Sequence, residues 1–306
     1  MSGHLKHRER GAALLFVLWI ITLLSIIAGS FGQTAKRESD FLAHAHERSQ
    51  TKALADGAIR YSVLMLTLPD PAQRWWADGT PYRWETEEGQ VEIRIFDEAG
   101  KLNINAVQEP VLRSVLSLLV KDADTASTLA DSILDWRDAD SDRRPQGAEL
   151  KDYLDPIRPK PQNRNFINLE EVRSVRGVSP ELFQKIKPWF TVYTGQGGIN
   201  FQKASKELLL TLSGDDKLKV ETFLREKRLG ITPNFQSATG IPAQNEGDLI
   251  YTLLLQAKLD GSKSGIFISA TVLMTPGGDP EPFVFISYEQ RAFHTNPNKV
   301  EPVTRQ

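Results

Sequence analysis

The feature that most constrains this chain is a long apolar stretch near its N-terminus. No charged residue occurs from Gly11 to Ala35, and residues 12–31 are nearly all Leu, Ile, Ala, Val, Phe and Trp. At a rise of about 1.5 Å per residue, about 20 such residues form a helix that crosses the roughly 30 Å hydrocarbon core of a bilayer. The sequence therefore predicts one membrane-spanning helix over residues 12–34.

The charges before this stretch predict its orientation. Lys6, Arg8 and Arg10 precede it, and positively charged flanks stay on the cytoplasmic side of a membrane. We therefore expect a cytoplasmic N-terminus and the bulk of the chain across the membrane. A cleavable signal peptide is the alternative, although residues 27–31, Ile-Ala-Gly-Ser-Phe, are a poor match to its cleavage site.

The composition of the chain gives no sign of a strongly charged partner such as a nucleic acid. The 306 residues carry a net charge of −2 and include no cysteine. A nearly balanced charge gives no indication of a polyanionic partner. The absence of disulfides is compatible with an oxidising compartment, which permits them without requiring them.

Periodicity after the apolar stretch predicts a mixed architecture. The helical pattern continues to Leu68 and ends at Pro69-Asp-Pro71, and residues 91–97 alternate apolar and polar as a half-buried strand does. Strand patterns return only at residues 250–259, 265–274 and 282–290, separated by turn residues. We expect an α+β fold in which one antiparallel sheet is interrupted by a large helical insertion. A separate β-domain is the alternative.

Three segments of the insertion place an asparagine before an expected helix. Asn105, Asn168 and Asn200 are predicted N-caps, with Gln108 and Glu171 placed as in a capping box. Residues 169–178 look like half of a helix-hairpin-helix unit, a motif that often binds DNA phosphate through a Gly-x-Gly turn. Here the turn is Gly-Val-Ser and acidic residues match the basic ones. A membrane-anchored nucleic-acid-binding protein is therefore the second hypothesis for function.

The densest group of carboxylates predicts a calcium site. Asp138, Asp140, Asp142 and Glu149 fall at the first, third, fifth and twelfth places of a calcium-loop template. Arg143 replaces the glycine of the sixth place, so the loop must have its own geometry. Alternatively, these aspartates cap the next helix or pair with arginines at a wet surface.

No motif of a known catalytic site is present. The chain has no Gly-x-Ser-x-Gly, His-Glu-x-x-His or phosphate-binding glycine loop, and its five histidines lie far from the carboxylates in sequence. We expect a protein that is not an enzyme.

Several strings together resemble one protein family. Asp135-Trp-Arg-Asp-Ala-Asp140, Gly147-Ala-Glu149, residues 165–178, Pro188-Trp-Phe-Thr-Val192 and Ile199-Asn200 are similar to the general secretion pathway protein K family, the minor pseudopilins of type II secretion. Arg10-Gly11 before the apolar run is similar to the processing site of pilins and pseudopilins. Most such subunits have glutamate at the fifth mature position, where this chain has Phe16.

The resemblance implies a pilin-like fold, a role and a set of sites. It implies a long N-terminal helix packed on an antiparallel sheet, with an inserted all-α domain of the helix-hairpin-helix or SAM-like type. It also implies prepilin-peptidase cleavage between Gly11 and Ala12 with N-terminal methylation, and one or two calcium ions. Asp138, Asp140 and Glu149 are the implied ligands, with Asp142 and Asp152 as helpers. Leu150-Lys151 departs from the acidic residues usual there, which leaves the ligand set open.

The implied organisation divides the chain into five parts. These are a prepilin leader (1–11), a transmembrane helix (12–34), the first part of a pilin-like domain (35–101), the helical insertion (102–232), and the final strands with the tail (233–306). The expected place is the bacterial inner membrane, single-pass, with the bulk in the periplasm, at the tip of the pseudopilus, which the subunit would initiate or cap. The expected partners are the minor pseudopilins I and J, with H as a further candidate, the major pseudopilin and prepilin peptidase. No nucleic acid is expected.

Overall fold

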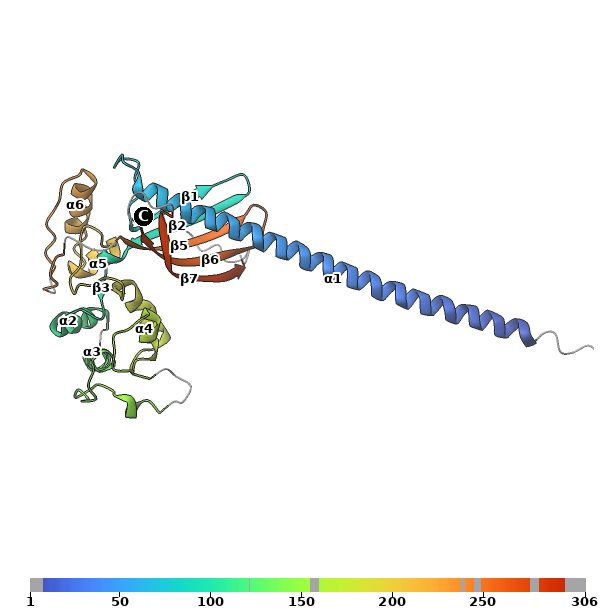
Figure 1. Ribbon diagram of the computed structural model, residues 1–306, viewed down its shortest axis with the longest axis horizontal. Coiled ribbons are helices and arrows are strands. Elements are labelled where there is room, and N and C mark those ends of the chain that lie inside the picture. Colours follow the sequence, from blue (N-terminus) through green and yellow to red (C-terminus); the bar gives the residue numbers. More distant parts are fainter. Residues whose placement is uncertain are drawn as a thin grey trace, which may run out of the picture.

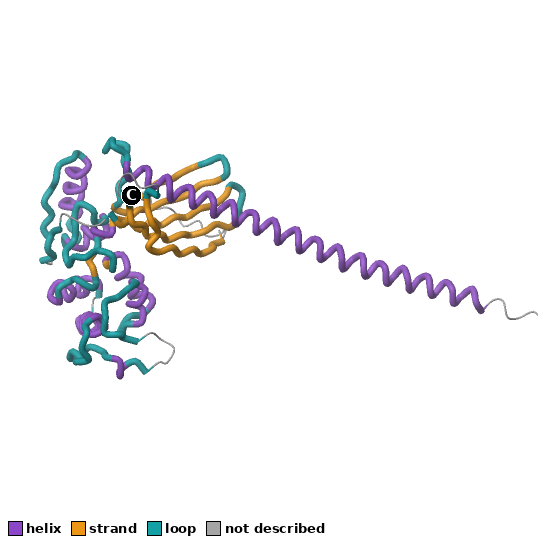
Figure 2. Tube along the Cα trace, viewed as in Figure 1, coloured by secondary structure: helices purple, strands orange, loops and turns teal. Residues whose placement is uncertain are grey.

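The computed structural model describes residues 8–120, 122–154, 160–237, 240–244, 249–275 and 281–294. A long helix projects as a rod from a head, and the sheet lies along the head-proximal part of that helix (Figure 1). The shorter helices gather at the end of the head remote from the rod (Figures 1 and 2). The expected α+β class, with a pilin-like helix on an antiparallel sheet and a helical insertion, is confirmed.

Helix α1 (Arg8–Thr67) is continuous over 60 residues. From Leu14 onward it is long and apolar enough to cross a membrane. In the half that projects beyond the head its apolar side chains are exposed, and Trp19, for example, is 75% exposed. Its last turns instead bury one face, with Ala55, Ala58 and Ile59 almost inaccessible. The helix stops just before Pro69, because a proline supplies no amide for the ladder and restricts the residue before it. The predicted leader, residues 1–11, lies partly outside the described residues.

The sheet has five strands in the order β1-β2-β5-β6-β7, all antiparallel. Side chains at every second position of β2, such as Val91, Ile93 and Ile95, face α1 and are fully buried. This is the two-residue period from which the strand was predicted. The bounds are β1 (Asp78–Glu85), β2 (Gly89–Asp97), β5 (Ile250–Leu259), β6 (Ser264–Met274) and β7 (Phe283–His294).

Two details of the sheet differ from the sequence prediction. Strand β1 was not predicted, because Gly79, Pro81 and polar neighbours obscure its alternation. Pro81 is tolerated because β1 is an edge strand, where a missing amide costs no ladder bond. Strand β7 extends to His294, beyond the predicted end at residue 290.

The insertion leaves the sheet unbroken. Strands β2 and β5 flank it in sequence and pair in continuous register from Gly89↔Leu259 to Asp97↔Tyr251. The insertion builds its own hydrophobic core from residues between Leu102 and Ile241. Its elements are α2 (Glu109–Leu119), α3 (Ala123–Arg137), α4 (Pro180–Ile186), α5 (Lys206–Leu212), α6 (Lys217–Arg228), the parallel pair β3 (Leu102–Asn103) and β4 (Phe190–Thr191), and the 3-10 helices η2 (Leu150–Asp152), η3 (Leu169–Ser174) and η4 (Lys187–Trp189). The 3-10 helix η1 (Glu98–Gly100) lies between β2 and the insertion.

Only one of the three predicted asparagine caps is correct. Asn168 caps η3 and forms a capping box with Glu171. Asn105 instead exchanges hydrogen bonds with the backbone of Phe166, at 2.8 and 2.9 Å, and α2 begins four residues later. Asn200 accepts a hydrogen bond from the amide of Gln202 in a turn, and the helix that follows, α5, begins only at Lys206 and is capped by Ser205. The prediction of caps at Asn105 and Asn200 was wrong because their side-chain amides form hydrogen bonds with backbone groups that belong to no helix.

Two ion pairs, each with a buried carboxylate, join the insertion to the sheet domain. Lys227 of α6 contacts Asp78 of β1 at 2.9 Å, with only 8% and 9% of the side chains exposed. Lys203 contacts Asp97, at the end of β2, at 3.0 Å. The amide of Asn200 donates to the carbonyl of Ala99 at 2.8 Å. The insertion is thus attached through contacts that need charged partners on both sides.

Candidate metal centre

The carboxylate-rich loop begins where α3 ends, and side chains of α3 determine its path. Asp131 accepts a hydrogen bond from the amide of Gln146 at 3.0 Å. Asp135, fully buried, accepts one from the Arg144 guanidinium at 2.7 Å. Gly147 passes so close to Asp135 that a Cβ there would collide with the carboxylate. The loop is therefore folded back onto the helix that precedes it.

The start of the loop is fixed by Arg137, the last residue of α3. Its guanidinium donates to the carbonyl of Val107 at 2.7 Å and to that of Ile104. Both carbonyls lie before α2, so the arginine ties the end of α3 to the segment that leaves the sheet. Asp138 follows directly as the C-cap residue of α3.

Three of the predicted ligands converge. One ligand oxygen from each of Asp138, Asp140 and Glu149 lies within 4.8 Å of the others. Glu149 is 2% exposed, Asp138 is half-buried and Asp140 is exposed. Both carboxylate oxygens of Glu149 and Oδ1 of Asp138 are buried without a hydrogen-bond partner in the described part of the chain.

The charge of this group is only partly compensated. Burial raises the pKa of Glu149, and the neighbouring carboxylates Asp135 and Asp138 raise it further. Burial likewise raises the pKa of Asp138, against the opposing effect of Arg144, whose Nη1 lies 2.5 Å from it. A buried carboxylate without a partner is costly, and a cation among the three would remove that cost.

These donors suit a hard cation such as calcium. Calcium takes carboxylate oxygens, and a glutamate with both oxygens free can bind it through both. Glu149 has this property and stands at the template's twelfth place. Asp138, Asp140 and Glu149 would therefore hold the ion, and the ion would neutralise the carboxylates that crowd the loop.

The other two predicted ligands do not join the group of three within the described ranges. The amide of Asp142 donates to Asp140 at 2.9 Å, and its carboxylate has no place in the cluster. Asp152 accepts a hydrogen bond from the amide of Glu149 at 2.9 Å and pairs with Arg143 at 3.4 Å. Asp152 thus orients the backbone of Glu149. A ligand role for either aspartate stays a prediction.

The sequence indicated Arg144 only as a surface ion-pair partner of the loop aspartates, in the alternative to a calcium site. Arg144 bridges Asp135 and Asp138 with one guanidinium nitrogen. Burial acts to lower the pKa of Arg144, but the hydrogen bonds that it donates to these carboxylates raise it. Its position nine residues after Asp135 follows no helical or strand spacing, so no sequence signal indicated that Arg144 bridges the buried Asp135 and Asp138.

The hairpin considered for nucleic-acid binding has one of its amides already occupied. The amide of Arg176, just before Gly177, donates to the Tyr153 hydroxyl at 3.1 Å. The Arg176 guanidinium donates to the carbonyl of Gly147 at 3.3 Å. A phosphate-binding turn needs free amides and free cations, so these contacts count against the second hypothesis.

The predicted processing and membrane positions lie on α1. Gly11 and Ala12 belong to its first turns, and Phe16 is 69% exposed on the apolar rod. Cleavage between Gly11 and Ala12 stays a prediction. Phe16 points outward with the other apolar side chains, as a lipid-facing residue would.

The fold and the site together define a class: a protein with a pilin-like fold, whose rod-shaped helix carries a head with a helical insertion and a carboxylate cluster. A sequence model of the family described as type II secretion system (T2SS), protein K, matches residues 95–195. That range contains the insertion's first helices and the candidate metal centre.

Individual relatives agree with the family match. The chain is 28% identical over 211 residues to type II secretion system protein K of Pectobacterium carotovorum subsp. carotovorum, covering 60% of this chain and 63% of the relative. It is 26% identical over 212 residues to that of Klebsiella pneumoniae, with the same coverage. The match spans less than two thirds of these relatives' own length. The resemblance to the protein K family is confirmed.

A solved structure shares the fold. It is a chain of the GspK-GspI-GspJ complex from the type 2 secretion system of enterotoxigenic Escherichia coli. The two chains superpose with a TM-score of 0.57 at 16% identity, over 80% of this chain and 97% of the other. At this identity the likeness establishes the architecture.

Proposed function

We propose that this chain is a minor pseudopilin of a type II secretion system, a structural subunit rather than an enzyme. It would be anchored once in the bacterial inner membrane by α1, with a cytoplasmic N-terminus and a periplasmic head. Prepilin peptidase would cleave it after Gly11. The resemblance to protein K and the apolar half of α1 support this proposal.

The finer proposal is a place at the tip of the pseudopilus. One observation carries it: the insertion occupies the end of the head remote from the rod (Figure 1). Subunits that stack along their rods would meet this insertion, which blocks a further subunit beyond it. Phe16 supports the same position, because a subunit without the usual buried carboxylate has no unpaired charge in the bilayer that requires a neighbour above it.

We propose partners by the same reasoning. One solved structure that shares this fold is a chain of a complex named for the K, I and J proteins, so subunits of the I and J types are the first candidates. The H-type and major pseudopilins are candidates further along the filament. Starting a filament has an entropic cost, because the first contacts must form before neighbouring subunits add stabilising ones. A small preassembled complex of this kind would overcome that cost.

The tip role is tested by combining Phe16→Glu with a Gly-Ser linker in place of residues 102–232. Because β2 and β5 pair directly, the sheet can persist without the insertion, and amide exchange of β5 and β6 verifies this. Phe16→Leu in the complete chain is the matched control. We expect altered pseudopilus length and reduced secretion only in the combined variant. Unchanged length and secretion would exclude capping.

Calcium at the candidate centre is the second part of the proposal. Its role would be structural, since it would neutralise three converging carboxylates and hold the loop against α3. We expect calcium to raise the melting temperature of the complete chain in detergent micelles, and magnesium to raise it less because it requires a stricter octahedral shell. Identical melting with calcium and with chelator would remove the site.

The nucleic-acid hypothesis is separated from the assembly role by one measurement. A duplex retained at low salt and released at high salt would indicate phosphate contacts. Co-purification of the chain with I-type and J-type subunits, without duplex binding, is the outcome that we expect.

A further inference from the structure

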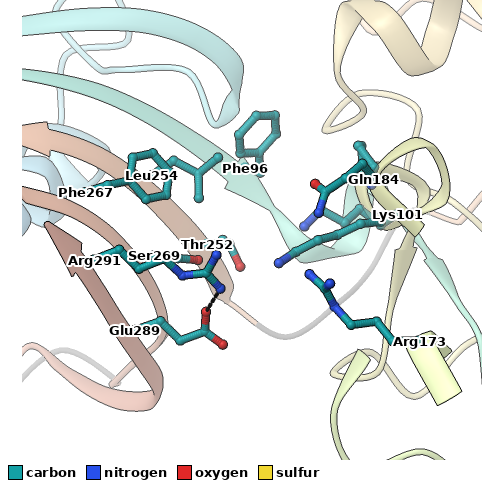
Figure 3. A pocket seen from close by; sticks show the side chains of 12 residues that line it. Phe96, Lys101, Arg173, Gln184, Thr252, Leu254, Phe267, Ser269, Glu289 and Arg291 are labelled. Carbon is teal, nitrogen blue, oxygen red and sulfur yellow. Dashed lines mark hydrogen bonds and ion pairs between the residues drawn. The ribbon is translucent and has the colours of Figure 1, made fainter. Parts of the chain in front are cut away.

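A cleft of about 310 Å³ lies between the outer face of the sheet and the insertion. Figure 3 shows its two walls. Strands β5, β6 and β7 provide one wall, and the segment around Lys101 together with η3 and α4 provides the other. The cleft is separate from the candidate metal centre, because none of its lining residues belongs to the carboxylate group.

Two cations from the insertion side point into the same space. In Figure 3 the Lys101 ammonium and the Arg173 guanidinium lie close together on the insertion side and point toward the sheet wall. Lys101 is only 14% exposed, and Arg173 is held in position by stacking on Phe183, 4.3 Å from the ring centre. Like charges that converge in a partly enclosed space favour an anion between them.

The carboxylates near these cations do not fill that space. Glu98 pairs with Lys101 at 2.5 Å but is itself 2% exposed. Glu170 is shared between Arg173 and Lys187. Although burial opposes it, the hydrogen bonds from Lys187 and Arg173 lower the pKa of Glu170, so this glutamate is charged. Lys101, Arg173 and Lys187 all line the cleft, but only two carboxylates, those of Glu98 and Glu170, pair with them. One positive charge on this wall of the cleft is therefore uncompensated.

The sheet wall of the cleft is mostly apolar. Phe96, Leu254 and Phe267 form it, and Phe267 is 39% exposed, which is high for a phenylalanine on a central strand. The hydroxyls of Thr252 and Ser269 lie among them (Figure 3). At the outer rim, Arg291 and Glu289 pair at 3.5 Å and cancel each other's charge.

We propose that this cleft binds a carboxylate-bearing, apolar peptide segment of a protein partner. The carboxylate would lie between Lys101 and Arg173, and an apolar side chain would cover Phe267 and Leu254. Charge and shape both support a peptide over a free inorganic anion, because an inorganic anion leaves the apolar wall uncovered. The space accommodates one or two side chains, which fits a short linear segment.

The test uses two matched peptides and the complete chain in detergent micelles. The probes are acetyl-Leu-Phe-Glu-amide and acetyl-Leu-Phe-Gln-amide, and the signals are the methyl resonances of Thr252 and Leu254. We expect saturable shifts with the glutamate peptide and about tenfold weaker binding of the glutamine peptide, because a hydrogen-bonded charge is lost. Sodium acetate and inorganic phosphate should also bind about tenfold more weakly, because neither covers the apolar wall.

Two variants and one control distinguish the outcomes. Arg173→Gln should weaken glutamate-peptide binding about tenfold, whereas Lys185→Gln, on the exposed side of α4, should leave it unchanged. Ser269→Asp supplies a carboxylate from the sheet wall itself, so it should abolish peptide binding and raise the melting temperature.

Three results would overturn the proposal. The first is equal binding of both peptides, and the second is binding unaffected by Arg173→Gln and Ser269→Asp. The third is binding that appears only after residues 295–306 are removed, because the chain's own tail would then be the occupant.

Discussion

Replacing Lys227 by methionine should loosen the contact between α6 and the sheet domain. The Lys227 ammonium lies 2.9 Å from the Asp78 carboxylate, and both side chains are less than a tenth exposed. The ammonium also lies 4.9 Å from the centre of the Trp76 ring. Methionine keeps most of the aliphatic volume over this ring but removes the charge, so the substitution isolates the ion pair.

The expected cost follows from the burial of the partner that remains. Removing one member of a buried ion pair costs about 3 to 5 kcal/mol, because the other charge is left without compensation. Thr80 still donates its hydroxyl to Asp78 at 2.6 Å, which places the expected cost at about 3 kcal/mol, the lower end of that range. This is a local cost, borne by the docking of α6 rather than by the whole sheet.

The pH dependence has a definite sign. Burial alone would raise the pKa of Asp78, but the attraction of Lys227 and the hydrogen bonds from Thr80 and Lys227 together outweigh it, so the pKa lies below the usual value. The stability from this pair is present above the unfolded-state pKa, about 3.9, and is lost as the pH falls through the lower folded-state value. In Lys227→Met the ammonium no longer opposes the effect of burial, so the pKa of Asp78 rises above its value in the parent protein. The difference between variant and parent should therefore shrink as the pH falls toward 4.

Amide hydrogen exchange of the complete chain in detergent micelles measures this effect. We expect faster exchange in α6 of Lys227→Met at pH 7, with β5 and β6 unchanged, and recovery of most protection in the double variant with Asp78→Asn. Arg225→Met, an exposed position on the same helix, is the control. If α6 exchanges at the parental rate in Lys227→Met, or if the double variant is no better, the pair does not hold the insertion to the sheet.

Three further predictions concern the insertion, each measured as thermal melting of the complete chain. Trp136→Ala should destabilise it by about 3 to 5 kcal/mol, because this side chain is 2% exposed and stacks on Phe166; a loss below 1 kcal/mol would contradict the packing. Gly147→Ala should cost about 1 to 3 kcal/mol, since the added Cβ displaces Asp135, whereas Gly195→Ala, with open space around it, should be neutral. Glu149→Gln should raise the melting temperature without calcium, because it removes a carboxylate whose pKa is raised by burial and neighbouring charge, and should abolish the calcium response; a preserved response would exclude Glu149 as a ligand.

Periodic features of this fold could be predicted from the sequence. The apolar run and the helical pattern after it predicted α1, the alternation in β2 predicted that strand, and strand patterns separated by turn residues predicted β5 and β6, each strand within a residue or two. Periodicity reports burial on one face, which is the property that these elements share. Strand β1 lacks it, because its exposed face and Pro81 dilute the signal, and so it was missed.

Contacts between distant residues could not be predicted. Asn105 had the local sequence of a helix cap, but its partner Phe166 is 61 residues away. Lys227 and Asp78 are 149 residues apart, and nothing in either segment indicates the other. For the metal centre, spacing identified Asp138, Asp140 and Glu149, which the structure brings together, whereas the separation of Asp142 from them depends on how the loop folds. Local spacing predicts which ligands are available, and tertiary folding decides which converge.

The way in which the insertion is attached explains how a large addition can leave a small sheet intact. Its two ends leave from β2 and return to β5, which are hydrogen-bonded neighbours, so the sheet needs no rearrangement. The two chain connections to β2 and β5 alone would let the insertion rotate relative to the sheet, because they lie side by side and do not fix its orientation. Lys203 with Asp97 and Lys227 with Asp78 supply two further attachments, at the end of β2 and on β1. Both are ion pairs with a buried carboxylate, so separating them exposes uncompensated charge. The cleft walls and the carboxylate loop are thereby presented in a fixed orientation relative to α1, which any assembly role for the head requires.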